Sequence, residues 1–394
     1  MKSNNITKLK YIYFFKSLNF FAPILALFYL ARGLNTFELL SLEVILISTL
    51  FLAEIPTGIL ADKIKRKYSI SLVILFYIIG NILTIYAESY FTFIIIQIIF
   101  GIGLAFGSGA VEALVYDTLK SENKEKEMNK YWGSINSKAL ISGVIAVLIG
   151  GFLTLSQDIN SYLLTFKLYT IGAVIALIIS FFIDEPNFKK QSKTESSIVI
   201  FKNSYNLILK NKNLRQIIYV SILTVPFPHI IKLLFQPYFN LVGVSSIYFG
   251  ISVSVAMLFG ALFLKYAFKI ENKFGIKKTI FLLNIIPAIA YILMSFIITP
   301  TYAILFYIII YSLSFMRNPI FSQYQNDHIE SKNRATTLSL ISMINSIYFI
   351  ISQLVIGVIA NYNLLLSFFI MGIIILISSI IFKIDESHIK NKKY

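Results

Sequence analysis

The sequence predicts an all-α membrane protein in which twelve transmembrane helices form two pseudo-symmetric six-helix bundles. The first observation is the composition: 57% of the 394 residues are hydrophobic, only 14% are charged, and the mean hydropathy is +0.76. A soluble protein of this length needs a far more polar surface, so the solvent of this chain is a membrane. The second observation is that apolar runs near the ~20 residues that span a bilayer recur from end to end.

Twelve apolar runs mark the expected helices in chain order. They cover residues 11–31, 39–61, 69–87, 92–117, 132–154, 162–183, 214–238, 245–267, 279–298, 301–323, 335–358 and 363–383. Because the first run lacks a small-residue cleavage site, we expect a retained helix and not a signal peptide.

The longest polar segment divides the twelve runs into two sets of six. We expect residues 1–183 to form the N-terminal bundle, residues 184–213 a cytoplasmic linker, and residues 214–394 the C-terminal bundle. The linker begins Asp-Glu-Pro and is rich in Lys, Ser and Asn, with a short amphipathic helix expected around 196–210.

Basic residues gather in every second loop and predict the orientation. They lie at 63–67, 120–130, 189–212, 269–278 and 390–393. Because cytoplasmic loops carry an excess of Lys and Arg, we expect these loops and both termini in the cytoplasm, in a multi-pass protein of the cell (plasma) membrane. The net charge of +16 could also indicate a nucleic-acid partner. Basic residues confined to loops between apolar runs favour the bilayer instead, and we expect no nucleic acid.

The loop after the second predicted helix is the most informative segment. Residues 54–67 read Glu-Ile-Pro-Thr-Gly-Ile-Leu-Ala-Asp-Lys-Ile-Lys-Arg-Lys, an apolar helix that ends in an acid and a run of positive charge. A related segment, Asn-Lys-Phe-Gly-Ile-Lys-Lys, begins at Asn272, 210 residues after Asp62. Asp117 and Asp327, at the ends of the fourth and tenth predicted helices, are also 210 residues apart. Two coincident offsets indicate a duplicated half, which is how many transporters are built.

On these residues the chain resembles the major facilitator superfamily. The superfamily pattern after helix 2 is Gly, three residues, Asp, a base, one residue, Gly, Arg and a base. Lys65 stands at the second Gly, and the remaining positions are matched by Gly58, Asp62, Lys63, Arg66 and Lys67. Residues 333–339, Asn-Arg-Ala-Thr-Thr-Leu-Ser, resemble efflux-type members, so the chain is similar to the drug/efflux-type branch. The Gly-Pro element that the antiporters carry in helix 5 is replaced by Ala146 and Val147. The resemblance implies alternating access and a monomer.

The charges of this motif suggest a gate. Asp62 and Asp117 are expected at inner helix ends, and Arg66 lies one helical turn beyond Asp62. Together with Gly58 of the same motif, they would latch helix 2 to helix 4 in the outward-facing state and release it when the cytoplasmic side opens. The resemblance implies the same role. An ordinary cluster of capping and positive-inside charges, without switching, is the alternative.

Ionisable residues deeper in the first half are candidates for proton coupling or a substrate cavity. Glu112 and Lys138 both sit roughly 10 Å inside helices 4 and 5, at 1.5 Å per residue, so we expect them to pair. The pair is either a static ion pair or a proton site in which protonation of Glu112 frees Lys138. Glu54 precedes Pro56, whose missing N–H leaves a carbonyl to satisfy. Glu54 is therefore either a structural group at a kink or a second proton site.

The second half carries His229, Lys232 and Arg317 in place of embedded carboxylates. Arg317 would bind an anionic group of the substrate, pair with an acid of the first half, or only hydrogen-bond carbonyls freed by the proline two residues on. Prolines at 226, 228 and 237 break helix 7 around the other two bases, which suits a bending gate. His229 is either a packed hydrogen-bonding residue or a proton carrier.

These features predict a secondary active transporter that works by alternating access and exports a hydrophobic or amphipathic small molecule in exchange for protons. The alternative is an importer or facilitator of a small metabolite, for which the bases of the second half suit an anion. A membrane-embedded enzyme and a non-transporting receptor are remote alternatives, because no catalytic constellation gathers at a membrane face. With no nucleotide-binding loop and no cysteine, we expect no direct use of ATP, no metal, no cofactor and no enzymatic activity.

Overall fold

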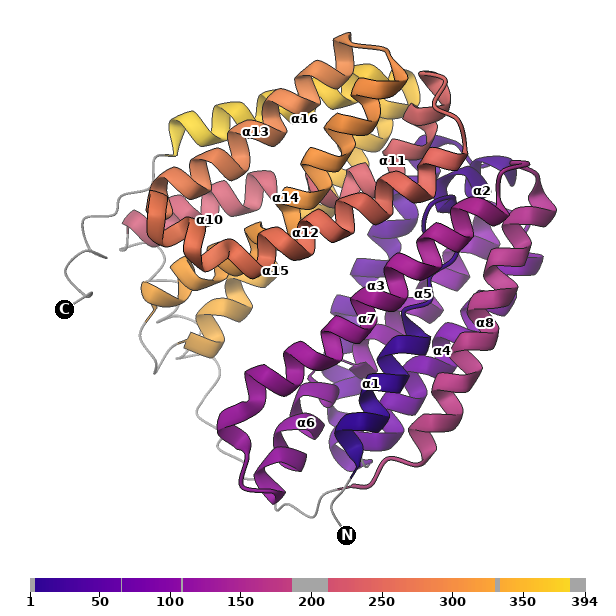
Figure 1. The fold of residues 1–394 in the computed structure, drawn as a ribbon, viewed down its shortest axis with the longest axis vertical. Coiled ribbons are helices and arrows are strands. Elements are labelled where there is room, and N and C mark those ends of the chain that lie inside the picture. Colours follow the sequence, from indigo (N-terminus) through magenta and orange to yellow (C-terminus); the bar gives the residue numbers. More distant parts are fainter. Residues whose placement is uncertain (1–3, 65, 108, 186–211, 330–333, 383–394) are drawn as a thin grey trace. The chain divides into compact units, whose positions relative to one another are not determined.

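The computed structural model describes residues 4–64, 66–107, 109–185, 212–329 and 334–382, shown as coloured ribbon in Figure 1. Within these ranges the regular structure is helical and no strand occurs. Eleven helical segments of the described residues are long and apolar enough to cross a membrane, and two of them, Tyr90–Ser121 and Leu214–Leu241, each contain two consecutive α-helices. The remaining predicted crossing is divided between two shorter helices at the N-terminus, Asn5–Lys16 and Leu25–Ala31. The predicted all-α membrane class is therefore confirmed.

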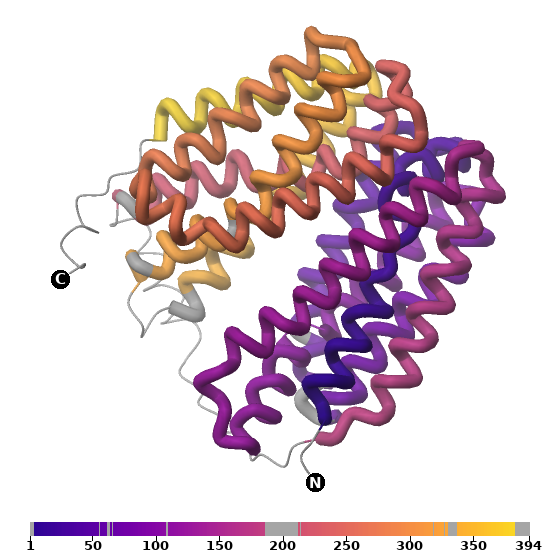
Figure 2. The backbone as a smooth tube through the Cα atoms, in the orientation of Figure 1, coloured from indigo at the N-terminus to yellow at the C-terminus, as the bar shows by residue number. Residues whose placement is uncertain are grey.

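The described helices follow the chain from indigo to yellow in Figure 2. Those of the first half are α1 (Asn5–Lys16), α2 (Leu25–Ala31), α3 (Thr36–Lys63), α4 (Arg66–Tyr86), α5 (Tyr90–Gly107), α6 (Ala110–Ser121), the short 3-10 helix η1 (Glu125–Glu127), α7 (Met128–Leu153) and α8 (Ile159–Phe181). Those of the second half are α10 (Lys212–Thr224), α11 (Phe227–Leu241), α12 (Ile247–Phe274), α13 (Ile276–Phe296), α14 (Pro300–Asp327), α15 (Arg334–Tyr362) and α16 (Leu364–Ile381).

Contacts within the chain define two compact units. The first comprises Met1–Gln191 and Ser245–Ser254, and the second comprises Ser192–Val244 and Val255–Tyr394. The exact bundle and linker boundaries at 183, 184–213 and 214 stay a prediction. The amphipathic helix expected around 196–210 lies outside the described residues.

The first predicted helix, 11–31, is not continuous, which corrects the sequence prediction. α1 ends at Lys16, tight turns fill residues 17–24, and α2 begins at Leu25. In the turns the N–H of Ala22 donates to Asn19 O at 3.1 Å, and the next residue is Pro23. Proline has no N–H and disfavours helix in the residue before it, so the interruption has a local cause that an average over hydropathy does not detect.

The fourth predicted helix, 92–117, is also divided. α5 ends at Gly107, and α6 begins at Ala110 after Gly109, whose φ of 71° lies in the left-handed region. Only glycine adopts this conformation at little cost, so Gly109 turns the chain between the two helices. Glu112 therefore stands in the first turn of a new helix and not deep within a continuous one.

The seventh predicted helix is interrupted at the position where the prolines predict a break. α10 ends at Thr224 and α11 begins at Phe227, with Pro226 as its N-cap and Pro228 in its first turn. Pro237 lies inside α11. Because the N–H groups of the first helical turn have no acceptor within the helix, Pro226 and Pro228 cost no hydrogen bond at the start of α11.

Capping residues fix several of the loop boundaries. Asn35 and Glu38 form a reciprocal capping box at the start of α3, with bonds of 2.9 Å in both directions. Asp158 caps α8, where its carboxylate accepts from the Ser156 hydroxyl and from the backbone N–H of Ser161. These two hydrogen bonds lower the pKa of Asp158.

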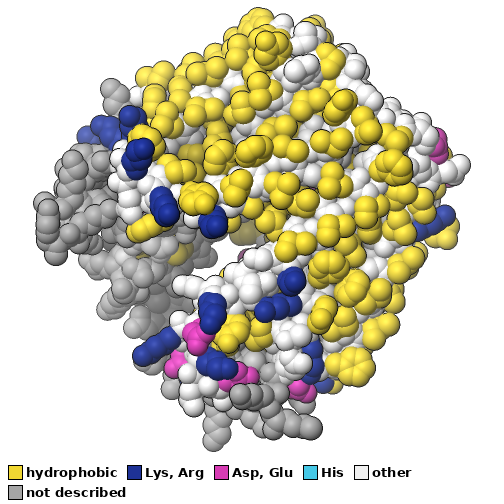
Figure 3. Space-filling model, viewed as in Figure 1, with side chains coloured by type: hydrophobic (Ala, Val, Ile, Leu, Met, Phe, Trp, Pro, Cys, Tyr) yellow, Lys and Arg dark blue, Asp and Glu magenta, His cyan; other side chains and the backbone are white. Residues whose placement is uncertain are grey.

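Each unit has its own apolar core. In the first unit it brings together buried side chains of α1, α4, α6, α7 and α8, among them Leu9, Ile74 and Leu114. In the second it joins α10, α12, α13, α14 and α15, among them Ile217 and Tyr324. Apolar side chains also cover most of the visible face in Figure 3, while in the first unit most charged side chains gather at the end near α6. This is the surface of a protein whose sides face lipid.

Candidate functional site

The end of the first unit where α3 is followed by α4 holds the charges of the motif. Arg66 begins α4, and its Nη1 forms an ion pair with the Asp117 carboxylate on α6. The same nitrogen donates to the carbonyl oxygen of Ala113 at 2.9 Å. The structure thus brings together two of the predicted gating residues. Gly58 lies on α3 with open space around it, and the side chain of Asp62 lies outside the described residues.

Glu185 joins this cluster and was not predicted. Its carboxylate accepts from the backbone N–H of Arg66 at 3.0 Å and from that of Lys67 at 3.1 Å. A carboxylate at this position satisfies two unpaired N–H groups and opposes the positive end of the dipole of α4. The only sequence signal was the Asp-Glu-Pro after the sixth predicted helix, which we interpreted as the start of a linker.

A second set of contacts ties the end of α8 to the start of α1. The ammonium group of Lys8 forms an ion pair with Asp184 at 2.7 Å, and the Asn5 side chain donates to the Asp184 carbonyl at 2.7 Å. The start of α1, the start of α4, α6 and the residues after α8 are therefore linked at one end of the unit by polar contacts through Asp184, Glu185 and Arg66.

The expected Glu112–Lys138 pair is not formed, and that prediction was wrong. Both side chains are exposed, and within the described ranges neither makes an ion pair. Glu112 belongs to α6 and Lys138 to α7, and the Gly109 turn sets the direction of α6 independently of α5. Counting residues along one continuous helix therefore misplaced Glu112.

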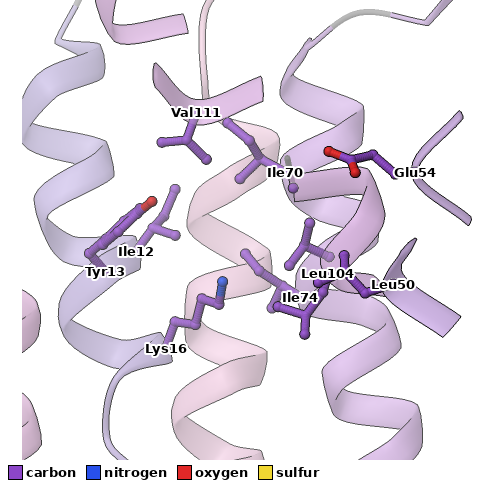
Figure 4. A pocket seen from close by; sticks show the side chains of 11 residues that line it. Ile12, Tyr13, Lys16, Leu50, Glu54, Ile70, Ile74, Leu104 and Val111 are labelled. Carbon is purple, nitrogen blue, oxygen red and sulfur yellow. The ribbon is translucent and has the colours of Figure 1, made fainter. Parts of the chain in front are cut away.

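A cavity of about 350 Å³ opens within the first unit, between α1, α3, α4, α5 and α6. Figure 4 shows Lys16 and Glu54 pointing into it from opposite sides, with Ile70, Ile74 and Leu104 among the apolar residues around them. The Lys16 ammonium lies 5.3 Å from the centre of the Tyr77 ring, a cation–π contact. Glu54, a predicted site residue, thus lines a real cavity.

Lys16 is a second functional candidate that the sequence did not predict. It is the last residue of α1, inside an apolar run that was interpreted as one helix. The available signal was a lysine within a membrane span, which is costly unless it faces a cavity or a partner. The break after Lys16 leaves its side chain free to turn into the cavity.

A smaller cavity of about 260 Å³ lies within the second unit. It brings together all three bases predicted there: His229 and Lys232 from α11 and Arg317 from α14. His229 and Lys232 are exposed at the cavity, whereas Arg317 is only 4% exposed. No Asp or Glu is among the described residues that line this cavity.

An aromatic ring lies next to each of these bases. The Lys232 ammonium lies 5.5 Å from the centre of the Tyr311 ring, and the Arg317 guanidinium lies 5.0 Å from that of Phe321. The His229 ring meets Phe349 edge-on, with 5.5 Å between the ring centres. The cavity is therefore a basic pocket with positioned side chains.

The family follows from a comparison of the whole chain with known proteins. Residues 11–347 match the model of the Major Facilitator Superfamily. The chain belongs to the major facilitator superfamily. It is therefore a membrane transporter of this superfamily, as the helix 2 motif suggested.

Two relatives extend this finding. The chain is 30% identical to the uncharacterized transporter BU466 of Buchnera aphidicola subsp. Acyrthosiphon pisum, over 56% of this chain and 55% of that protein. The match thus spans about half of that relative. The chain is also 22% identical to the uncharacterized MFS-type transporter YxaM of Bacillus subtilis, over 93% of this chain and 92% of that protein.

Solved structures agree on the fold. The nucleoside transporter NupG superposes with a TM-score of 0.80 at 13% identity, over 99% of this chain and 100% of that one. A bacterial homologue of the human lysosomal transporter Spinster gives a TM-score of 0.71 at 14% identity, over 96% and 95%. Identities this low show the shared fold alone.

Proposed function

We propose that the protein is a secondary active transporter that works by alternating access and exports a hydrophobic or amphipathic small molecule in exchange for protons. The observation that carries the coupling is the cavity of the first unit, where Lys16 and Glu54 face a mostly apolar space. Ionisable groups inside membrane spans are costly and mark ion pathways. Protonation of Glu54 removes one charge from this space, so it changes the stability of whichever state encloses the cavity.

The gate of this cycle is the inner-end cluster. The Arg66–Asp117 ion pair would hold the inner end closed, together with the Glu185 carboxylate that accepts from the N–H groups at the start of α4. Gly58 and Asp62 of the motif would share this role. Opening the inner side breaks the ion pair and exposes both charges to water. Because both side chains are already partly exposed, this costs little and can be offset by substrate or proton binding.

The deeper ionisable groups of the first half have separate roles in this proposal. Both interpretations of the Glu112–Lys138 pair, the static ion pair and the proton site that frees Lys138, fall with the missing contact. In this proposal Glu112 binds a proton without Lys138 as its partner, and its exposed carboxylate is reachable for protons.

A second candidate function is uptake or facilitated passage of a small anionic metabolite. The basic cavity of the second unit supports it, because His229, Lys232 and Arg317 meet there without an acid among its described lining residues. Export and uptake share the alternating-access mechanism and differ in the direction of the coupling gradient.

The test is flux in proteoliposomes that hold the full-length protein. Radiolabelled or fluorescent compounds of both classes are followed with and without an imposed pH gradient. We expect gradient-dependent flux that Glu54→Gln abolishes, while Glu88→Gln at the exposed outer end leaves it intact. Glu112→Gln in the same assay decides whether Glu112 takes part. Flux that ignores the pH gradient would overturn the proton coupling and favour facilitation.

The proposal places the protein in the plasma membrane as a monomer with both termini inside. The chain has no cysteine, so single introduced cysteines can be labelled without background. Lys126→Cys near α6 should react only with membrane-permeant thiol reagents in intact cells, and Glu88→Cys with impermeant ones as well. The reverse pattern would overturn the orientation.

A further inference from the structure

The guanidinium of Arg317 has an unused edge. Its Nη1 donates to the carbonyl oxygen of Thr224 at 2.9 Å. Among the residues that the structure describes, its Nε and Nη2 have no hydrogen-bond partner, although both are shielded from solvent. These two nitrogens form one side of the planar group, the fork that fits two oxygens of a carboxylate or phosphate.

Leaving this edge unused is costly. A buried charge is stable in a protein when it is paired and hydrogen-bonded, and each unpaired buried donor carries its full desolvation penalty. Phe321 stacks on the guanidinium, and a ring face offsets only part of that penalty. The carboxylate of Glu271, elsewhere in the second unit, accepts from Gln323 at 3.4 Å and does not line this cavity. The unused edge therefore fits an anion that is a ligand and not one of the residues lining the cavity.

The other two bases are arranged to share such an anion. His229 and Lys232 are three residues apart on α11, so they lie on one face of the helix and border the same cavity as Arg317. The volume of about 260 Å³ is below the range of sites that enclose a drug-sized molecule. It suits an anionic group and the few atoms attached to it, reached by a small side-chain shift at the wall.

We propose that this cavity is the subsite that binds the anionic group of the transported molecule, a carboxylate or phosphate held by the Nε–Nη2 edge of Arg317 and by Lys232. The inference rests on the proposed transport function and adds the substrate class. It fits an amphipathic acid as the exported compound and an organic anion as the imported one. Neutral and cationic compounds lack the group that the subsite requires.

The test measures the thermal unfolding midpoint of the full-length protein in detergent, at constant ionic strength in chloride. The probes are succinate, glycerol phosphate and inorganic phosphate, with succinamide and glycerol as uncharged counterparts. We expect at least one anion to raise the midpoint saturably and its uncharged counterpart to have no effect. A carboxylate-only, an ester-only or a free-phosphate response distinguishes the sources of the anionic group.

Variants assign the binding to the cavity. Arg317→Gln should raise the anion concentration that gives the half-maximal midpoint shift by about tenfold or more. This is the loss of affinity expected when a contact of two charge-assisted hydrogen bonds is removed. Arg317→Lys should not restore it, because an ammonium group lacks the fork. Lys232→Gln should weaken it less, and Lys265→Gln, an exposed lysine on α12 outside the cavity, should leave it unchanged.

Two outcomes overturn the inference. One is an anion response that Arg317→Gln leaves intact, and the other is no saturable response to any of the three anions. Proton-coupled flux of uncharged compounds in vesicles, without anion binding, would reject the subsite and keep the transport function. Anion binding without any flux would do the opposite.

Discussion

Among the described glycines of the first unit, an added Cβ would come nearest to another backbone segment at Gly150 on α7, so Gly150→Ala is a sharp test of that packing. A Cβ at this position would lie 1.8 Å from the carbonyl oxygen of Phe20, in the turns between α1 and α2. Ordinary contact begins at 3.4 Å, so the two segments would have to separate by the difference, about 1.6 Å. The obstacle is backbone, which cannot rotate away as a side chain does.

The size of the effect follows from two opposing terms. Alanine is favoured over glycine inside a helix by about 1 kcal/mol. Overpacking a close contact costs about 1–3 kcal/mol and more when backbone must move. Because backbone must move here, the overpacking cost is about 3 kcal/mol or more. After subtracting the helix preference of alanine, Gly150→Ala should lower the free energy of unfolding by about 2 kcal/mol or more. Gly133→Ala on the same helix has open space around it and should be neutral or slightly stabilising.

The measurement is thermal unfolding in detergent, followed by far-ultraviolet circular dichroism and by Trp132 fluorescence. Trp132 is the single tryptophan and packs edge-on against Tyr13 of α1, so it reports the contact between α1 and α7. If the Gly150→Ala protein is as stable as the Gly133→Ala protein, the inference that α7 packs tightly against the turns after α1 is refuted.

Three further substitutions test the inner-end cluster and the first cavity. Arg66→Lys should cost about 1 kcal/mol and slow flux in proteoliposomes, because lysine keeps the charge but loses the guanidinium geometry that serves both Asp117 and the backbone. Glu185→Gln should lower the unfolding midpoint, equivalent to about 1–2 kcal/mol, because it removes the charge facing two N–H groups at the start of α4. Lys16→Gln should preserve the unfolding midpoint or raise it, since burying an ammonium is costly, and should alter the dependence of flux on the pH gradient.

Matched controls make these outcomes decisive. Glu88→Gln removes an exposed acid 3.5 Å from Arg32 and should leave the unfolding midpoint nearly unchanged. Lys10→Gln alters a lysine of α1 that does not line the cavity. If Glu185→Gln has the same unfolding midpoint as Glu88→Gln, the role of Glu185 at the start of α4 is contradicted. If Lys16→Gln has the same flux profile as Lys10→Gln, the role of Lys16 in the cavity is contradicted. If Arg66→Lys keeps full stability and flux, the role of the Arg66 guanidinium is contradicted.

Much of the fold could be predicted because its signals are local. The end of α3 and the start of α4 around Arg66, the proline break before α11 and the helical class all follow from short stretches of sequence. The divisions after Lys16 and at Gly109 were missed, because averaged hydropathy stays high across a turn that is itself apolar. Their local signals, Pro23 and a glycine pair, were present but weaker than the apolar run that contains them.

The candidate site was predicted unevenly for the same physical reason. Arg317, His229 and Lys232 were recognised because charged or titratable residues in apolar runs are conspicuous. Glu185 was missed, because its partner is a helix terminus more than a hundred residues away in the chain. The contact expected between Glu112 and Lys138 does not form, because the chain turns at Gly109 and a depth counted along one continuous helix misplaced Glu112.

The sequence by itself determined that this chain is a transporter of the major facilitator superfamily with twelve predicted crossings, since hydropathy and one short motif record the solvent and the family. Only the tertiary structure decided which charges meet: Arg66 with Asp117 and Glu185, Lys16 opposite Glu54, and Arg317 beside Lys232. Such meetings depend on how each helix is rotated and where it is interrupted, and those properties are fixed by packing between segments distant in the chain.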